Sequence, residues 1–137
     1  MKVLLDTNVI IDYAAKRMPF FLEADVIFDK IIEKKIFASI SANTVTDIFY
    51  ILKRENNKEN TLNFIIELVK IVEILNVNKE IIISALYSGW TDFEDAVQAN
   101  VALSNDIDYI ITRNKKDYEQ LIGIEAISPK DFLTRYE

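Results

Sequence analysis

Asp6 is the first acidic residue of the chain and marks a predicted change of secondary structure. It follows the apolar run at residues 2–5 and precedes residues with helical spacing, so a strand is expected to end and a helix to begin there. We expect Thr7 or Asn8 to cap that helix. Asp6 could also act only as a cap or dipole partner. Alternatively, a carboxylate at the carboxyl end of a first, central strand lies in the crevice where α/β sheets bind ligands.

A second group of acids opens a later predicted helix. Thr91 and Glu94 form the S/T-x-x-E capping-box pattern, which gives Glu94 a complete structural explanation. Asp92 fits compensation of the helix dipole and a functional role equally well. Asp95 shares a helix face with the small Ala99, which suits close packing, and a carboxylate on such a face is costly unless it is paired or bound to a metal. We therefore interpret Asp95 as a functional residue.

Three further polar residues belong to the same prediction. Asp47 lies on a predicted helix away from its apolar stripe, and on its own it would be a solvated helix acid. Asn114 and Asp117 follow the apolar strand predicted at 109–111. Because parallel strands end at one edge of a sheet, Asp6, Asp95 and Asn114 are expected at the same edge. Asp117 could equally be a first-turn helix acid.

The sequence contains no cysteine and no histidine, which excludes several kinds of catalysis. Disulfide frameworks, thiolate nucleophiles, Ser-His or Cys-His pairs and Cys/His zinc sites are all ruled out. Acid–base chemistry must rest on carboxylates, Lys, Tyr or metal-bound water. The net charge of −6 argues against a protein held to nucleic acid by a general positive field. Acids that converge on divalent cations would nevertheless reverse the charge locally.

Strands and helices are predicted to alternate along the whole chain. We expect strands near 2–5, 36–40, 71–75, 109–111 and 125–127, and helices from 6 to a break at 16–19 and near 20–35, 41–54, 58–70, 78–88, 90–104, 115–121 and from 128 onward. The strands are too apolar to have a wet face, which indicates a mostly parallel sheet covered on both sides. The sequence therefore predicts an α/β fold: a three-layer α/β/α arrangement around four to five strands, in a single domain over residues 1–137.

Targeting signals are not expected in this sequence. Lys2 is followed by only three apolar residues before Asp6, which does not make a signal peptide, and the apolar runs are too short to cross a bilayer. The lack of cysteine fits a reducing compartment. We expect a soluble, cytoplasmic protein with no membrane partner.

Four motifs carry these residues in order along nearly the whole chain. They are Asp6-Thr7-Asn8, Ile40-Ser41-Ala42-x-Thr44-x-x-Asp47, Asp92-x-x-Asp95-Ala96 and Ile111-Thr112-Arg113-Asn114-x-x-Asp117-Tyr118. Each motif is weak alone, but the four in sequence are fairly specific. Together they resemble the PIN-domain nucleases, and above all the VapC-like toxins of bacterial and archaeal toxin–antitoxin pairs. The resemblance implies a PIN-like fold.

The resemblance also implies the residues of a site. Its catalytic positions match Asp6, Asp47, Asp95 and Asn114, where Asp47 is one methylene shorter than the family's usual Glu and Asn114 replaces the Asp of a Thr-x-Asp turn. Asp6, Asp47, Asp92 and Asp95 would hold Mg²⁺ or Mn²⁺, hard ions that prefer carboxylate oxygens. Thr7, Asn8, Thr112 and Asp117 would support them, with Asp117 or Asp92 able to take over from the missing acid.

The function implied is metal-dependent endoribonuclease activity of a toxin, with RNA as substrate, a small antitoxin as partner and a homodimer as the assembly. Candidate RNA contacts are Lys16, Arg17, Arg113 and Lys115, together with Lys53, Arg54, Lys116 and a stacking Trp90. Each of these could also be plain solvated surface.

Two other functions stay open. A catalytically silent binding module would keep the scaffold and act through partners, and Asn114 is its best support. A phosphoacceptor or phosphatase-like domain would use Asp6 as the acceptor, although Asn8 stands where such a hydrolase would have a second acid.

Overall fold

The computed structural model describes residues 1–136 and is organised around a five-stranded parallel sheet. In chain order the elements are β1 (Lys2–Leu5), α1 (Thr7–Ala14), α2 (Phe21–Ile32), β2 (Phe37–Ser41), α3 (Ala42–Glu55), α4 (Lys58–Ile71), β3 (Glu73–Leu75), α5 (Lys79–Leu86), α6 (Phe93–Leu103), β4 (Tyr109–Ile111), the 3₁₀ helix η1 (Lys115–Tyr118), β5 (Glu125–Ile127) and α7 (Pro129–Arg135). The predicted strand and helix alternation is therefore confirmed.

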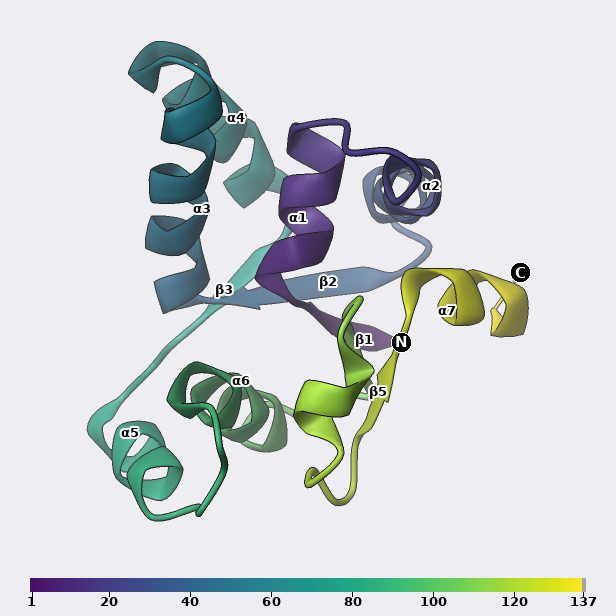
Figure 1. Ribbon diagram of the computed structural model, residues 1–137. Coiled ribbons are helices and arrows are strands. Elements are labelled where there is room, and N and C mark those ends of the chain that lie inside the picture. The colour runs from purple at the N-terminus through teal and green to yellow at the C-terminus, as the bar shows by residue number, and fades with distance from the viewer. Residues whose placement is uncertain (137) are drawn as a thin grey trace.

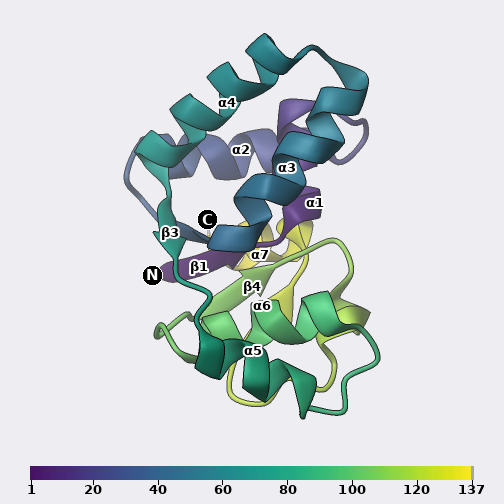
Figure 2. The same ribbon diagram turned by 90° about the vertical axis from the view of Figure 1, so that its left-hand side faces the viewer.

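Helices cover both faces of the sheet (Figures 1 and 2). Side chains of α1 to α4 and of α7 form one core with Val3 and Leu5 of β1, while α5, α6 and η1 form a second core with Leu4. Successive strand residues point to opposite faces, so the buried residues of a central strand are mainly apolar, as Val3, Leu4 and Leu5 of β1 are. This arrangement confirms the predicted three-layer α/β/α fold.

The strand order β3-β2-β1-β4-β5 places a topological switch point between β1 and β4. From β1 the chain moves outward to β2 and β3, and it then returns to place β4 on the other side of β1. Such a switch opens a crevice at the carboxyl ends of the two strands. Asp6 follows β1 and Thr112 follows β4, and the Asp6 amide donates to the Ile111 carbonyl at 3.0 Å.

Several element boundaries differ from those predicted. Helix α2 ends at Ile32 because Lys34 adopts a left-handed conformation with φ 62°. Helix α4 continues to Ile71, so the third strand is shorter than the predicted 71–75. Helix α6 begins at Phe93, later than predicted, and the turn after β4 continues as a short 3₁₀ helix. Within residues 1–136 no helix is both long and apolar enough to span a membrane.

A buried ion pair fixes α1 to the turn after β4, and the sequence patterns did not predict it. The Asp12 side chain on α1 is almost fully buried, and its two carboxylate oxygens accept from the Arg113 guanidinium at 2.6 and 3.3 Å. A buried carboxylate without such a partner would be strongly destabilising. Arg113 therefore serves to hold the β4–η1 turn in place.

Replacing Asp12 with alanine should leave the Arg113 charge without its partner and lower the free energy of unfolding by roughly 2–3 kcal/mol. The loss is smaller than for a fully buried pair because Arg113 is partly exposed. Urea unfolding measures this change. The matched control is Glu125→Ala, which breaks the exposed ion pair with Arg135 and should cost less than about 1 kcal/mol. Equal, small effects of both variants would contradict the structural role of Asp12.

Candidate functional site

The Asp6 carboxylate is held by donors from three parts of the chain. Its Oδ2 accepts from the Thr112 hydroxyl at 2.7 Å, from Asn8 Nδ2 at 3.3 Å and from the Tyr118 hydroxyl at 3.3 Å. Its Oδ1 accepts the Thr7 amide at 2.8 Å. Asp6 is thus the N-cap of α1, and the prediction of Thr7 or Asn8 as the cap was wrong. The cap leaves acceptor capacity on Oδ1, so capping does not exclude a ligand role.

Asn8 and Thr112 connect the two turns that frame this carboxylate. Asn8 Nδ2 also approaches the Thr112 hydroxyl at 3.4 Å, and Asn8 Oδ1 accepts the Arg113 amide at 3.2 Å. The Thr112 hydroxyl accepts the Asn114 amide at 3.0 Å. The turn after β1 and the turn after β4 are therefore rigidly joined at Asp6.

The start of α6 differs from the predicted capping box. Asp92 is the N-cap, and its Oδ1 accepts the Asp95 amide at 2.9 Å. The predicted cap at Thr91 with Glu94 as its partner was therefore wrong. Because the helix begins later, Glu94 takes no part in capping, and its carboxyl group is close enough to Asp47 for the two acids to influence each other. Glu94 consequently belongs to the candidate site, from which the capping-box pattern had removed it.

Asp47 on α3 is not the solvated acid that its helix position suggests. Its Oδ2 is buried and has no hydrogen-bond partner among residues 1–136, and the same holds for Asn43 Oδ1 and Gln98 Oε1. Gln98 Nε2 donates to Thr44 Oγ1 at 3.2 Å, which links α6 to α3. Buried acceptors without a donor are destabilising unless water or a cation reaches them. This part of the site has the oxygen donors that a hard cation prefers.

A cavity of about 300 Å³ gathers most of the predicted residues at the switch point. Its lining includes Asp6, Thr7, Asn8, Glu94, Asp95, Gln98, Asn114 and Asp117, together with the positively charged side chain of Arg17. Thr112 lies behind Asp6, Asp47 beside Glu94, and Asp92 is an exposed cap that does not line the cavity.

Burial and neighbouring acids together raise the pKa of the carboxyl groups in this cavity. Burial, followed by the charges of Asp92, Asp117 and Asp6, raises the pKa of Asp95 to about 7. The side-chain interaction with Asp47, followed by burial and the neighbouring charges, raises the pKa of Glu94 to about 7. Burial also raises the pKa of Asp6, although its hydroxyl and amide donors oppose the shift. Acids that repel in this way bind a cation favourably.

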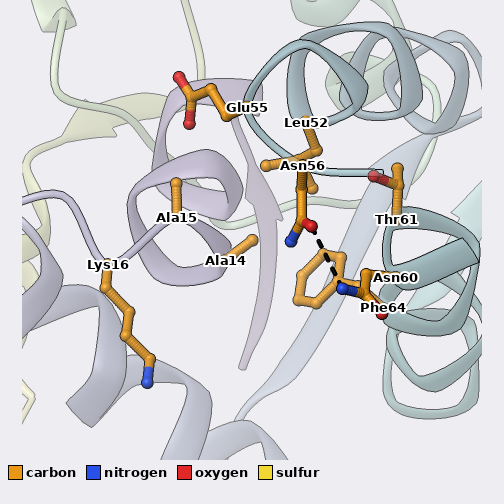
Figure 3. Close-up of a pocket in the computed structure, with 9 residues that line it drawn as sticks. All are labelled: Ala14, Ala15, Lys16, Leu52, Glu55, Asn56, Asn60, Thr61 and Phe64. Carbon is orange, nitrogen blue, oxygen red and sulfur yellow. Dashed lines mark hydrogen bonds between the residues drawn. The ribbon is translucent and has the colours of Figure 1, made fainter. Parts of the chain in front are cut away.

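The predicted RNA contacts are dispersed. Figure 3 shows that Lys16 borders another cavity, of about 260 Å³ between α1, α3 and α4, with its ammonium group directed away from the labelled cavity residues. Arg113 is paired with Asp12, and Lys115 lies on η1 outside the carboxylate cavity. Arg17, by contrast, lines the carboxylate cavity. It also pairs with Glu55, which lines the cavity between α1, α3 and α4.

Sequence patterns did not identify Glu94, Gln98 and Tyr118 as site residues. Gln98 is only 3% exposed on an otherwise apolar face of α6. A single polar residue on that apolar face was the one feature of the sequence that could have indicated a role for Gln98. Tyr118 is buried against Asp6, and this burial together with the nearby carboxylates raises its pKa, so it stays a neutral hydroxyl donor.

The donor set fits a divalent cation, although within residues 1–136 no three acids are drawn together into a ready-made metal cluster. Mutual repulsion spreads like-charged carboxylates around a cavity. The buried, unpaired Asp47 Oδ2 and the raised pKa of Asp95 are what an oxygen site for a hard cation would show.

Comparisons with known proteins agree with this geometry. The family model of the PIN domain matches residues 2–116, which confirms the resemblance to that family. No curated protein sequence matches the chain.

Solved structures share the fold at low sequence identity. VapBC-1 from nontypeable Haemophilus influenzae is 23% identical, with a TM-score of 0.68 over 95% of this chain and 99% of that chain. A toxin–antitoxin complex from Klebsiella pneumoniae is 22% identical, with a TM-score of 0.68 over 93% and 97%. VapC20 from Mycobacterium tuberculosis, described as a sarcin–ricin loop cleaving toxin, is 15% identical, with a TM-score of 0.65 over 79% and 86%.

In a buffer with chelator, the thermal midpoint of unfolding should fall as the pH rises from about 5 to about 8. Both Asp95 and Glu94 have a folded-state pKa of about 7, above their ordinary values. Between those values and about pH 7 the folded state binds more protons than the unfolded state, so stability falls across this window and levels off above it. Glu94→Gln should raise the midpoint near pH 8 by roughly 2–4 °C, because solvent screens these partly exposed charges. The exposed Glu59→Gln is the control and should behave as the parent. A midpoint that rises steadily to pH 8 would contradict the raised pKa values of Asp95 and Glu94.

Proposed function

Because the chain belongs to the PIN-domain family, we propose that it is a divalent-metal-dependent endoribonuclease that hydrolyses phosphodiester bonds of RNA. The observation that carries the proposal is the convergence of carboxylates from the β1–α1 turn, the start of α6 and η1 on one cavity at the switch point. Nucleases of this family generally use divalent metals. The fold relative from Mycobacterium tuberculosis is itself described as cleaving the sarcin–ricin loop, which supports RNA as the substrate class.

We assign the cation, Mg²⁺ or Mn²⁺, to Asp6, Asp47 and Asp95, with Glu94 and Asp117 adding negative charge around them. When bound, such an ion activates water for attack on phosphorus and neutralises charge that develops on the phosphate. Asp92 remains a proposed accessory acid that acts at a distance through its charge on Asp95.

The protein's own side chains would set the geometry of this reaction. Thr112, Asn8 and Tyr118 occupy Oδ2 of Asp6 and so direct the free acceptor capacity of Oδ1 toward the ligand. Asn114 carries an amide in the same cavity and can donate to a phosphate oxygen that a carboxylate would repel. Arg17 at the cavity can contact the RNA backbone.

Membership of this family also suggests protein partners. We propose a cytoplasmic toxin that forms a homodimer and is inhibited by a small antitoxin. The fold relatives from Haemophilus influenzae and Klebsiella pneumoniae are a VapBC protein and a toxin–antitoxin complex, which supports the antitoxin.

A catalytically silent binding module is the second candidate, favoured by Asn114 and by the spread arrangement of the acids in the described residues. Calorimetric titration with Mn²⁺ at about pH 7.5 separates the two. The nuclease should bind Mn²⁺ with an affinity that Asp95→Asn weakens at least about 10-fold, since a carboxylate ligand is lost. The absence of any saturable Mn²⁺ heat for the parent would favour the silent module.

Asp6→Asn should reduce Mg²⁺-dependent cleavage of RNA at least about 100-fold, because it removes the charge at the centre of the donor set. Cleavage of a labelled total-RNA or structured-RNA substrate, resolved on a gel, measures this loss. Asp106→Asn is the matched control: Asp106 is exposed before β4, at the opposite edge of the sheet, and its φ of 53° suits asparagine. Equal cleavage by Asp6→Asn and the parent would refute the mechanism.

A further inference from the structure

We propose that a second cavity, adjoining the carboxylates, binds one unpaired nucleobase of the RNA next to the cleaved bond; this inference rests on the proposed function. The cavity measures about 520 Å³ and lies between the starts of α2 and α7 and the turn after β4. Helices α2 and α7 lie side by side at this end of the molecule (Figure 1). The lining of the cavity includes Pro19, Phe20, Glu23, Arg113, Asn114, Pro129 and Lys130.

The two cavities share Asn114 as a lining residue. This residue lines the carboxylate cavity and the second cavity alike, so a ligand that reaches one lies directly beside the other. An RNA strand with its phosphate at Asp6 and Asp95 therefore has its neighbouring base within reach of the second cavity. This shared wall favours an occupant that is part of the same nucleic-acid ligand.

The walls of the cavity suit a flat, uncharged ring. Phe20 is 43% exposed although it is a large aromatic residue, and the Arg113 guanidinium lies 4.1 Å from its ring centroid. Pro19 and Pro129 add rigid apolar surface. Unpaired bases are commonly recognised by stacking on aromatic rings and on guanidinium planes. Because Asp12 holds Arg113 in place, the platform is ordered before any ligand arrives.

The charges of the lining favour a base over a phosphate group. The Arg113 charge is neutralised by Asp12, and Glu23 also lines the cavity and offsets Lys130. In residues 1–136 neither Glu23 nor Lys130 has an ion-pair partner, so both stay available to polar groups on the ligand. A nearly neutral, apolar cavity beside an acidic one would place the base in the first and the cleaved phosphate in the second.

Binding of a fluorescently labelled oligouridylate in the presence of chelator tests the assignment without cleavage. Oligouridylate stacks little on itself, so contacts with the protein dominate the anisotropy signal. Phe20→Ala should weaken binding roughly 5- to 100-fold, because stacking of one base contributes about 1–3 kcal/mol. Phe20→Trp should bind at least as tightly as the parent, because the larger flat ring keeps the stacking surface.

Two controls test whether the loss of binding comes from base stacking. Phe37→Ala removes an exposed phenylalanine at the amino end of β2, at the opposite edge of the sheet, and should leave RNA binding unchanged. Inorganic polyphosphate has phosphates but no bases, so Phe20→Ala should not alter its binding. Circular dichroism melting confirms that each variant is folded.

Equal oligouridylate binding by the parent and Phe20→Ala would overturn the base-binding assignment. An equal loss for polyphosphate would also overturn it, since the effect would then concern phosphates. If the parent binds no oligouridylate, the assignment fails and a protein segment becomes the occupant to test. Metal-dependent cleavage that needs Asp6 but not Phe20 would refute this inference and leave the proposed function intact.

Discussion

The hydrogen bonds to Asp6 join parts of the chain that are far apart in sequence, and the site depends on them. Thr112 and Tyr118 reach it from beyond β4, more than one hundred positions along the chain. They can do so because β1 and β4 are neighbours in the sheet and end at the same edge. A carboxylate at this position would be expensive to bury without donors, and with four of them it becomes a fixed point from which both turns take their conformation.

Negative charge is the second constraint on the molecule. Burial raises the pKa of Asp95 to about 7, and the side-chain interaction with Asp47 raises the pKa of Glu94 to about 7; repulsion from neighbouring acids adds to both shifts. The Asp12–Arg113 ion pair and the Gln98–Thr44 hydrogen bond hold the surrounding elements against that repulsion. The stable parts of the fold thereby support a group of acids that would be unfavourable on its own, as is common where function requires it.

Sequence patterns predicted the sheet and the place of Asp6 because both depend on local rules. An apolar run that ends at a polar residue marks a buried strand and its carboxyl end. The start of α6 was predicted less well, because Thr91 and Asp92 are both good caps. With Thr91 as the cap Glu94 would be a capping residue, whereas with Asp92 as the observed cap Glu94 is available to the site. Asp12 and Arg113 lie 101 positions apart, and no local pattern reports such a pair. Domain count and ligand roles remain predictions.

Asn114 is best understood together with Asp117. The short η1 helix brings Asp117 back to the carboxylate cavity, with its amide bonded to the Asn114 carbonyl at 2.9 Å, so the negative charge absent at position 114 is supplied one turn later. A neutral side chain at 114 then has a separate advantage. This residue stands between the acidic cavity and the nearly neutral one, and a carboxylate there would repel a nucleotide from both sides. With Asn at 114 and Asp at 117, the turn keeps its negative charge on the carboxylate cavity and leaves the wall shared by the two cavities uncharged.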